Sequence, residues 1–157
     1  MEAAQITYLI GDATDPIQST DKPTIRVIIH ICNDIDRWGK GFVLALSKKW
    51  PQSKDVYHQS SKDLGSCSLF QIEEGLYICN MIAQHGISKV GGIPPIRYDA
   101  LKSCLEVLAG WSRSQTIPVS FHGPRMGAGL AGGDWSQIEA LLLQELSGHP
   151  IYIYDLP

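Results

Sequence analysis

Apolar residues recur along the chain at two spacings, one typical of buried strands and the other typical of helices. Short runs rich in Ile, Val, Leu and Tyr and bounded by Gly, Pro or Asp predict strands, whereas apolar residues at every third or fourth position predict helices. The predicted strands are 6–10, 24–32, 68–72, 76–83, 117–121 and 151–154, and the helices that can be placed by residue are 42–50, 97–113 and 135–146.

The order of these elements predicts the fold class. Strands and helices alternate along the chain, and residues 24–32 (TIRVIIHIC) are almost continuously apolar, as in a central strand whose sheet is covered on both faces. With about six strands and four helices in total, we expect an α/β fold of three layers in which the sheet lies between helices. No repeat, low-complexity tract or linker interrupts residues 1–157, so we expect a single domain.

Composition narrows the classes of function. The 157 residues carry a formal net charge of -3, and 44% of them are hydrophobic, which is enough for a core but gives no general basic field. We therefore expect no general nucleic-acid binding, and any recognition of phosphate must be local. Residues 1–5 contain no basic stretch and no apolar run reaches membrane-spanning length, so we expect a cytoplasmic protein without a membrane partner.

The spacing of cysteines and histidines argues against metal and disulfide chemistry. The cysteines form no close pair, and His30 with Cys32 is a single short pair without further residues at ligand spacing. Cys32 and Cys79 fall in strand patterns, where apolar burial makes a thiol unreactive. We expect no metal and no cofactor. The four cysteines are Cys32, Cys67, Cys79 and Cys104.

Gly11 and Asp12 directly follow the first predicted strand. Ligands of open α/β sheets bind beyond the carboxyl ends of strands. A carboxylate there can accept a hydrogen bond from the exocyclic amine of adenine, while the next backbone N–H, that of Ala13, can serve a ring nitrogen. A Gly-Asp pair is equally consistent with a simple turn, so both interpretations stay open.

The sequence WGKG (38–41) stands between a predicted strand and a predicted helix. Glycine lets the backbone at a helix N-terminus approach a phosphate closely, so these four residues are a candidate diphosphate site.

The strand before it ends in HICND (30–34). Alternation places His30, Cys32 and Asp34 on one face of the strand and Asn33 on the other, so one face or the other can meet a sugar. A single histidine of this kind is more often a satisfied core residue than a catalytic one.

The segment PRMGAGLAGGDW (124–135) is a glycine-rich loop between a strand and a helix. Its small residues leave backbone donors uncovered, as an anion-binding nest requires. Asp134, with Gln137 three residues later, predicts a capping box for the last helix. Residues 127–132 also match GxGxxG, with Asp155 near the acidic position of a dinucleotide-binding fingerprint. However, in a dinucleotide-binding domain the glycines follow the strand directly and several further strands build the cleft. Here the glycines begin several residues beyond the strand and one further strand follows, which argues against such a domain.

These motifs, in this order and over essentially the whole chain, resemble the macrodomain family. Within it the sequence is similar to the branch that contains ADP-ribose 1″-phosphate phosphatases and the terminal ADP-ribose protein glycohydrolase. The resemblance implies a three-layer α/β/α sandwich with a central mixed sheet, and ADP-ribose or a derivative of it as the ligand. It also implies an ADP-ribosylated protein as a further partner.

The resemblance implies a role for each motif. Asp12, with Ala13 beside it, holds the adenine amine, and Asn33 meets the distal ribose. His30 takes the first position of the usual N-A-A-N and matches a histidine proposed to act in phosphatase-like members, so His30 and Asn33 are the candidate catalytic residues. The two phosphate loops consist of Trp38, Gly39, Lys40 and Gly41, and of Gly127, Ala128, Gly129 and Leu130.

The sequence departs from the glycohydrolase at two positions. That enzyme uses a lysine on the segment that matches 80–85 and an aspartate at the position of Ala131, and neither residue type stands there in this chain. Its lysine-based mechanism is therefore not expected. His85 and Asp134 lie nearby and are conceivable substitutes.

The sequence leaves three hypotheses about function. The first is a hydrolase that acts on the distal ribose of an ADP-ribose derivative, either its 1″-phosphate or its link to a target. In it His30 is the general acid or base, with a pKa suited to neutral pH, and Asn33 orients the ribose or the water. The second is a module that binds free or protein-linked ADP-ribose without catalysis. The third is an NAD-dependent oxidoreductase that uses the glycines of 127–132.

Overall fold

The computed structural model describes residues 6–18 and 20–157, so the prediction made for residues 1–5 lies outside it. Its strands are β1 (Ile6–Ile10), β2 (Ile25–Asn33), β3 (Cys67–Glu73), β4 (Leu76–Gln84), β5 (Val119–Gly123) and β6 (Ile151–Asp155). Its helices are α1 (Phe42–Lys49), α2 (Gln52–Gln59), α3 (Tyr98–Arg113) and α4 (Trp135–Glu145).

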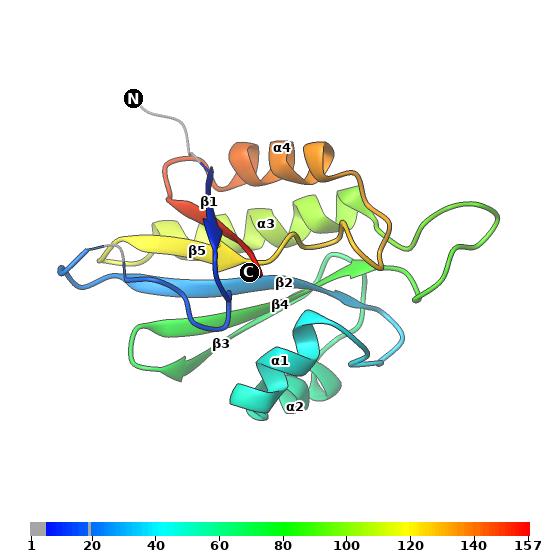
Figure 1. The fold of residues 1–157 in the computed structure, drawn as a ribbon, viewed down its shortest axis with the longest axis horizontal. Coiled ribbons are helices and arrows are strands. Elements are labelled where there is room, and N and C mark those ends of the chain that lie inside the picture. The colour runs from blue at the N-terminus through cyan, green and yellow to red at the C-terminus, as the bar shows by residue number, and fades with distance from the viewer. Residues whose placement is uncertain (1–5, 19) are drawn as a thin grey trace.

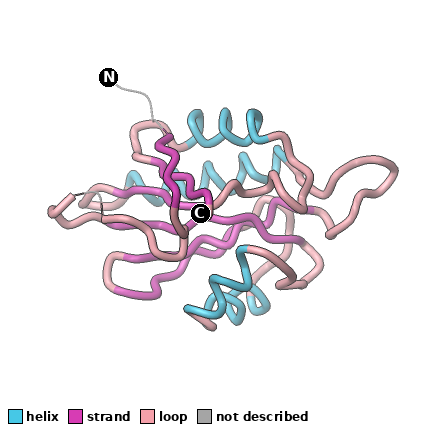
Figure 2. Tube along the Cα trace, viewed as in Figure 1, coloured by secondary structure: helices cyan, strands magenta, loops and turns pink. Residues whose placement is uncertain are grey.

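The strands form one six-stranded sheet in the order β1-β6-β5-β2-β4-β3 (Figure 1). All neighbouring pairs are parallel except β3 and β4, which are antiparallel, so the sheet is mixed as expected. Because β2, β4 and β5 run in the same direction, the loops that follow them leave one end of the sheet together. Figure 2 shows these loops in pink, with the loop after β4 projecting farthest beyond the sheet.

Two pairs of helices cover the two faces of the sheet. Val27 and Ile29 of β2 pack in a core that includes α3 and α4, whereas Ile28 packs in a second core with Leu46 of α1 and Tyr57 of α2. Strand side chains point alternately to the two faces, which is why the run in β2 is continuously apolar. The predicted α/β/α fold is confirmed (Figure 1). No helix within residues 6–18 and 20–157 is long and apolar enough to cross a membrane.

The fifth strand lies two residues later than the sequence predicted. Pro118 has no N–H to donate to a neighbouring strand, and the pairing with β2 begins at Val119. The strand then continues through His122, which pairs with Ile28, to Gly123. The apolar pattern did not predict strand at residues 122–123, because His122 is polar. With these residues included, β5 ends beside the candidate site.

The helix α2 was not placed by residue from the sequence. It follows Pro51, the residue that ends the preceding helical pattern, and it buries two of its own side chains, Ser53 and Tyr57. Such a sparse apolar stripe gives almost no periodic signal. Its position against the sheet matters because Tyr57 contacts Asn33 of the candidate site, and the Ser53 carbonyl contacts Asn80, the hydrogen-bond partner of His30.

Candidate functional site

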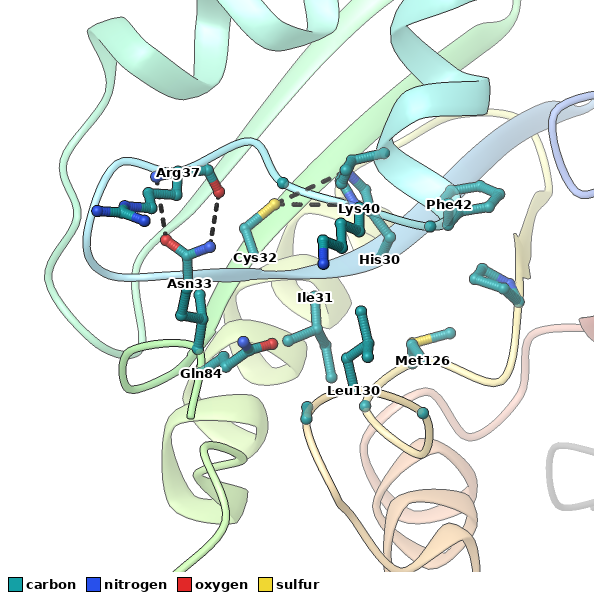
Figure 3. A pocket seen from close by; sticks show the side chains of 18 of the residues that line it. His30, Ile31, Cys32, Asn33, Arg37, Lys40, Phe42, Gln84, Met126 and Leu130 are labelled. Atoms are coloured by element: carbon teal, nitrogen blue, oxygen red, sulfur yellow. Dashed lines mark hydrogen bonds between the residues drawn. The ribbon is translucent and has the colours of Figure 1, made fainter. Parts of the chain in front are cut away.

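A cavity of about 650 Å³ opens at the end of the sheet where β2, β4 and β5 finish. Three loops form its walls: the loop from β2 to α1, the loop after β4 and the glycine-rich loop from β5 to α4 (Figure 3). These loops come from strands that are neighbours in the sheet but distant in the sequence. This volume is typical of a small-molecule site.

Most of the residues predicted from the sequence meet in this cavity, and three do not. Those that line it are His30, Asn33, Trp38, Gly39, Lys40, Gly41, Gly127, Gly129 and Leu130. Those outside the lining are Asp12, Ala13 and Ala128. The two glycine-bearing loops therefore converge on one space, as the predicted diphosphate site requires.

The first loop ends in a helix N-terminus that no side chain caps. Gly41 is the N-cap of α1, and its backbone angles of φ 79 and ψ -135 belong to a region that only glycine occupies readily. Within the described chain, no hydrogen bond uses the backbone N–H groups of residues 39–43. These donors, together with the helix dipole, favour an anion at this end of the cavity.

The second loop is closed by hydrogen bonds of its own. The N–H of Gly133 donates to the Gly127 carbonyl at 2.7 Å, and the N–H of Gly132 donates to the Gly129 carbonyl at 3.0 Å. Gly127 has a φ of +76, and a Cβ there would lie 2.9 Å from the Ile31 and Ile96 side chains, so only glycine fits. In the described chain the N–H groups of residues 129–131 form no hydrogen bond. They provide a second run of donors across the cavity.

The cavity wall is positively charged although the chain as a whole is acidic. Arg37, Lys40 and Arg125 line it, and no Asp or Glu of residues 6–18 and 20–157 does. Arg125 is held by Asp155 through contacts of 2.8 and 3.0 Å, which raise the pKa of the guanidinium. Arg37 and Lys40 form no ion pair with any described residue. These two unpaired cations match a diphosphate bridge, which carries one negative charge on each phosphate.

His30 is buried at the base of the cavity. Its exposed fraction is 2%, and its ring packs against Trp38 and Phe42 with centroid distances of 5.8 and 5.6 Å. Its Nε2 lies 2.5 Å from Oδ1 of Asn80 on the neighbouring strand β4. Burial lowers the pKa of His30 to about 4, although the hydrogen bond to Asn80 opposes this shift. The expectation of a pKa suited to neutral pH is therefore wrong, because the ring is desolvated and stays uncharged.

Asn33 lines the cavity, but its carboxamide also shapes the chain around it. Nδ2 donates to the Arg37 carbonyl at 2.6 Å, and Oδ1 accepts from the N–H groups of Ile35 and Arg37 and from the Tyr57 hydroxyl at 2.8 Å. The strict alternation expected for this segment ends here, because the pairing with β4 shifts register between Cys32 and Asn33. Asn33 thus shares the cavity with His30 and Cys32 instead of facing away from them.

Asp12 forms a local turn at the end of β1. Its Oδ1 accepts hydrogen bonds from the N–H and the hydroxyl of Thr14, both at 2.8 Å, which is the simple turn that the sequence left open. The carboxylate is exposed, and neither it nor Ala13 lines the cavity. The turn is tied to α1 by Lys49, whose Nζ donates to the Thr14 carbonyl at 2.7 Å. Asp12 therefore lies beyond the cavity lining.

The conceivable substitutes for the glycohydrolase residues do not line the cavity. Asp134 is the N-cap of α4 and accepts from the N–H of Ser136 at 2.9 Å, which confirms the N-cap. The reciprocal half of the predicted capping box does not form, because the N–H of Asp134 donates to the Tyr98 hydroxyl and Gln137 lies near the Asp134 carboxylate instead. His85 contacts Asp34 at 2.7 Å, and Asp34 also accepts from the N–H of Gly86. These contacts lower the pKa of Asp34 and hold the start of the loop after β4.

Cys32 also lines the cavity, with its Sγ 3.8 Å from Nδ1 of His30 (Figure 3). Burial raises the pKa of this thiol, so it stays protonated and is a poor nucleophile, in line with the expectation from its strand position. Within residues 6–18 and 20–157, no group of three or more His, Cys, Asp or Glu side chains is arranged to hold a metal ion.

Sequence reasoning missed part of the wall. Gln84, Ile87 and Ser88, at and after the end of β4, line the cavity, as does Arg37 in the first loop. The irregular, glycine-bearing stretch after β4 was a signal for them, because such loops at strand ends often carry function. What the sequence did not reveal is that β4 lies directly beside β2 in the sheet.

Solved structures share this fold and much of its sequence. A protein of unknown function from Bacteroides thetaiotaomicron is 44% identical, with a TM-score of 0.89 over 98% of this chain and 99% of that chain. A macrodomain protein from Streptomyces coelicolor is 36% identical, with a TM-score of 0.78 over 96% of this chain and 99% of that chain. No protein-family model matches the sequence.

Two curated proteins are related at lower identity. Mouse chromodomain-helicase-DNA-binding protein 1-like is 28% identical over 171 residues, and the match covers 100% of this chain but 18% of that much longer protein. The ADP-ribose 1″-phosphate phosphatase of Saccharomyces cerevisiae is 25% identical over 182 residues, and the match covers 98% of this chain and 99% of that enzyme.

Proposed function

Because this chain belongs to the macrodomain family, we propose that it binds ADP-ribose or a derivative of it in the cavity between the two glycine loops. One observation carries the proposal. Two runs of unpaired backbone N–H groups, at residues 39–43 and 129–131, line one cavity with the unpaired cations Arg37 and Lys40. A diphosphate satisfies both runs, because each phosphate oxygen can accept several hydrogen bonds and carries negative charge.

The two ends of the cavity suit the two ends of this ligand. Phe42 at the start of α1 supplies an apolar wall, which suits a purine, and Lys49 at the other end of α1 contacts the turn that holds Asp12. Asn33 and Gln84 supply polar groups at the other wall, which suits a ribose with several hydroxyls, whereas the His30 ring packs against Phe42 itself. In this orientation the diphosphate lies over Gly41, and Asp12 reaches the adenine amine from beyond the lining.

Titration calorimetry with ADP-ribose tests this proposal. We expect saturable binding of ADP-ribose and weaker binding of AMP, which lacks the second phosphate and the distal ribose. Failure of ADP-ribose to bind at millimolar concentration would overturn the proposal. NAD is included because binding of NAD with hydride transfer, measured by absorbance, would instead support the oxidoreductase hypothesis.

The role of Asp12 needs a separate titration. If it holds the adenine amine, Asp12→Ala weakens ADP-ribose about tenfold, a usual cost for a lost charge-assisted hydrogen bond, but leaves the hypoxanthine analogue unchanged. If its role is confined to the turn with Thr14, the variant lowers the melting temperature and affects both ligands alike.

A second candidate function is hydrolysis at the distal ribose. It is favoured by the end-to-end relationship to the yeast ADP-ribose 1″-phosphate phosphatase and by the place of His30 in the cavity lining. In this reaction water attacks the phosphorus, the bond to the ribose oxygen breaks, and ADP-ribose and inorganic phosphate are released. His30 is the side chain of the described lining whose neutral ring nitrogen can accept a hydrogen bond from the attacking water, and its lowered pKa of about 4 makes it a weak base at neutral pH.

Phosphate release from ADP-ribose 1″-phosphate separates the two functions. Turnover that is lost in His30→Gln, with ADP-ribose binding retained, supports a hydrolase. Tight binding without turnover of this phosphate or of an ADP-ribosylated peptide supports a binding module. The lack of the glycohydrolase lysine and aspartate favours the binding module for protein-linked ADP-ribose. The single-domain organisation and cytoplasmic location stay predictions.

A further inference from the structure

His30 and Asn80 form a buried pair between neighbouring strands of the sheet. His30 lies on β2 and Asn80 directly opposite on β4, with exposed fractions of 2% and 1%. The Asn80 carboxamide has a second partner: its Nδ2 donates to the Ser53 carbonyl of α2 at 3.2 Å. A carbonyl oxygen can only accept, so this contact fixes which way the carboxamide faces. Oδ1, an acceptor, is therefore turned towards His30.

The orientation of Asn80 determines where the imidazole carries its proton. Since Oδ1 accepts, Nε2 of His30 must donate, so Nε2 bears the hydrogen in the neutral ring. Nδ1 then has a lone pair that can accept a hydrogen bond. The protonated Cys32 thiol, whose Sγ lies 3.8 Å from Nδ1 and 4.0 Å from Nε2 and which also lines the cavity, is a weak donor to it that a ligand hydroxyl or water can replace (Figure 3).

We propose that Asn80 is a positioning residue of this site, which holds His30 in one orientation and one tautomer so that Nδ1 is kept as a hydrogen-bond acceptor at the cavity wall. The tautomer of His30 does not depend on the proposed function. Its consequence does rest on that function: when the ligand is bound, Nδ1 accepts a hydrogen bond from a ribose hydroxyl or a water molecule. Such an acceptor matters here because no carboxylate of the described chain lines the cavity.

No charged group packed against His30 disturbs this arrangement. The same strand contributes the Cys32 thiol, which burial keeps protonated by raising its pKa. Tyr57 of α2 reaches His30 through Trp38, and burial raises the pKa of its hydroxyl as well. On β5, burial lowers the pKa of His122 to about 3, so this ring is uncharged near neutral pH. Lys40 lines the same cavity, and Lys62 lies over the Tyr57 ring with Nζ 4.7 Å from its centroid; both positive charges favour the unprotonated Nδ1.

Nitrogen NMR of the histidine rings tests the proposal without any ligand. In protein labelled with ¹⁵N-histidine and assigned with His30→Gln, we expect His30 to show a protonated Nε2, an unprotonated Nδ1 and no titration between pH 5.5 and 8. A protonated Nδ1 in the wild-type protein, or titration of His30 within this range, would overturn the proposal.

The variant Asn80→Asp tests whether Asn80 determines the protonation state of His30. A carboxylate at this position stabilises the doubly protonated ring, so we expect the His30 pKa to rise by at least about one unit. A raised pKa with wild-type circular dichroism supports the proposal, and an unchanged titration overturns it. If this variant does not fold, the wild-type spectra still decide the tautomer.

The pH dependence of ADP-ribose binding then tests the consequence. We expect wild-type affinity to be flat between pH 5.5 and 8, and affinity of Asn80→Asp to fall with decreasing pH as Nδ1 becomes protonated. A flat profile in a variant whose His30 pKa has risen overturns the acceptor role of Nδ1. Absence of ADP-ribose binding in the wild type rejects the proposed function instead, and leaves the NMR result on the tautomer standing.

Discussion

The two helices that follow the glycine loops begin in opposite ways. At α4, Asp134 accepts hydrogen bonds from both the N–H and the hydroxyl of Ser136, at 2.9 and 2.7 Å. At α1 the N-cap is Gly41, which offers no side-chain acceptor, and the first turn holds no acidic residue. Relative to a side-chain N-cap, a glycine N-cap costs a helix roughly a few tenths of a kcal/mol, and an alanine about 1 kcal/mol. The unsatisfied end is the one that opens into the cavity, so its donors are available to a ligand.

The loops differ in the same way. In the second loop, several N–H groups donate hydrogen bonds to carbonyls of the same loop. Gly127 and Gly133 are packed so closely that a Cβ at either position would clash. The first loop uses none of the N–H groups of residues 39–43 within the described chain. We infer that the first loop supplies most of the donors to the diphosphate and that the second, more tightly packed loop supplies the shorter run at residues 129–131. Variants of the two loops should therefore behave differently.

Charge reversal in the first loop should have the largest effect. Lys40 is exposed and forms no ion pair with a described residue, so Lys40→Glu should leave the fold intact while placing a carboxylate beside the diphosphate. Loss of a charge-assisted contact together with new repulsion should weaken ADP-ribose by about a hundredfold in calorimetry. The matched control is Lys102→Glu on α3. It makes the same charge change at a residue that does not line the cavity, so it should leave the affinity for ADP-ribose unchanged. Equal losses in both variants would contradict a local site.

A methyl group at Gly41 should have the next largest effect. Nothing lies within 4 Å of the point that a Cβ would occupy there, so the cost arises from the backbone angles alone, about 1–3 kcal/mol. If Gly41→Ala relaxes to another conformation, the donors of residues 39–43 no longer converge, and affinity should fall about tenfold. Gly110→Ala, in the last turn of α3, is the control and should raise the melting temperature. Unchanged ADP-ribose affinity in Gly41→Ala would show that the first loop does not bind the phosphates.

Gly129→Ala should have a smaller effect on binding. This glycine lacks a positive φ and has open space where its Cβ would point, so the free protein should keep its melting temperature. The methyl group would still hinder close approach of a phosphate to the second run of donors, and we expect affinity to fall by about threefold, less than 1 kcal/mol. A loss larger than that of Gly41→Ala, measured by the same titration, would reverse the assignment of the two loops.

The features shared by both loops could be predicted from the sequence, because each depends on local order. Strand pattern, then glycine, then helix pattern places a loop at the carboxyl end of a strand whatever the rest of the chain does, and the positive φ of Gly41 and Gly127 needs glycine. The cap at Asp134 was equally predictable, because the acceptor and its partners lie within three residues.

Features that depend on the order of strands in the sheet could not be predicted. The wall formed by Gln84, Ile87 and Ser88 exists because β4 lies beside β2, which the order of elements along the chain does not reveal. The state of His30 is a similar case. Its tautomer is set by Asn80, fifty residues away in sequence, and its low pKa by burial beneath Trp38 and Phe42.

Removal of the α4 cap should have the smallest effect on binding and a clear effect on stability. Asp134→Ala leaves the first N–H groups of α4 without an acceptor, which should lower the free energy of unfolding by about 1 kcal/mol and the melting temperature by about 2–4 °C. Because Asp134 does not line the cavity, the affinity for ADP-ribose should stay within about twofold, well under 1 kcal/mol. Gln144→Ala, an exposed substitution in the last turn of the same helix, is the control and should change neither quantity. A tenfold loss of affinity in Asp134→Ala with Gln144→Ala unaffected would mean that the capped end of α4 also takes part in binding, and the contrast between the two helix ends would then be lost.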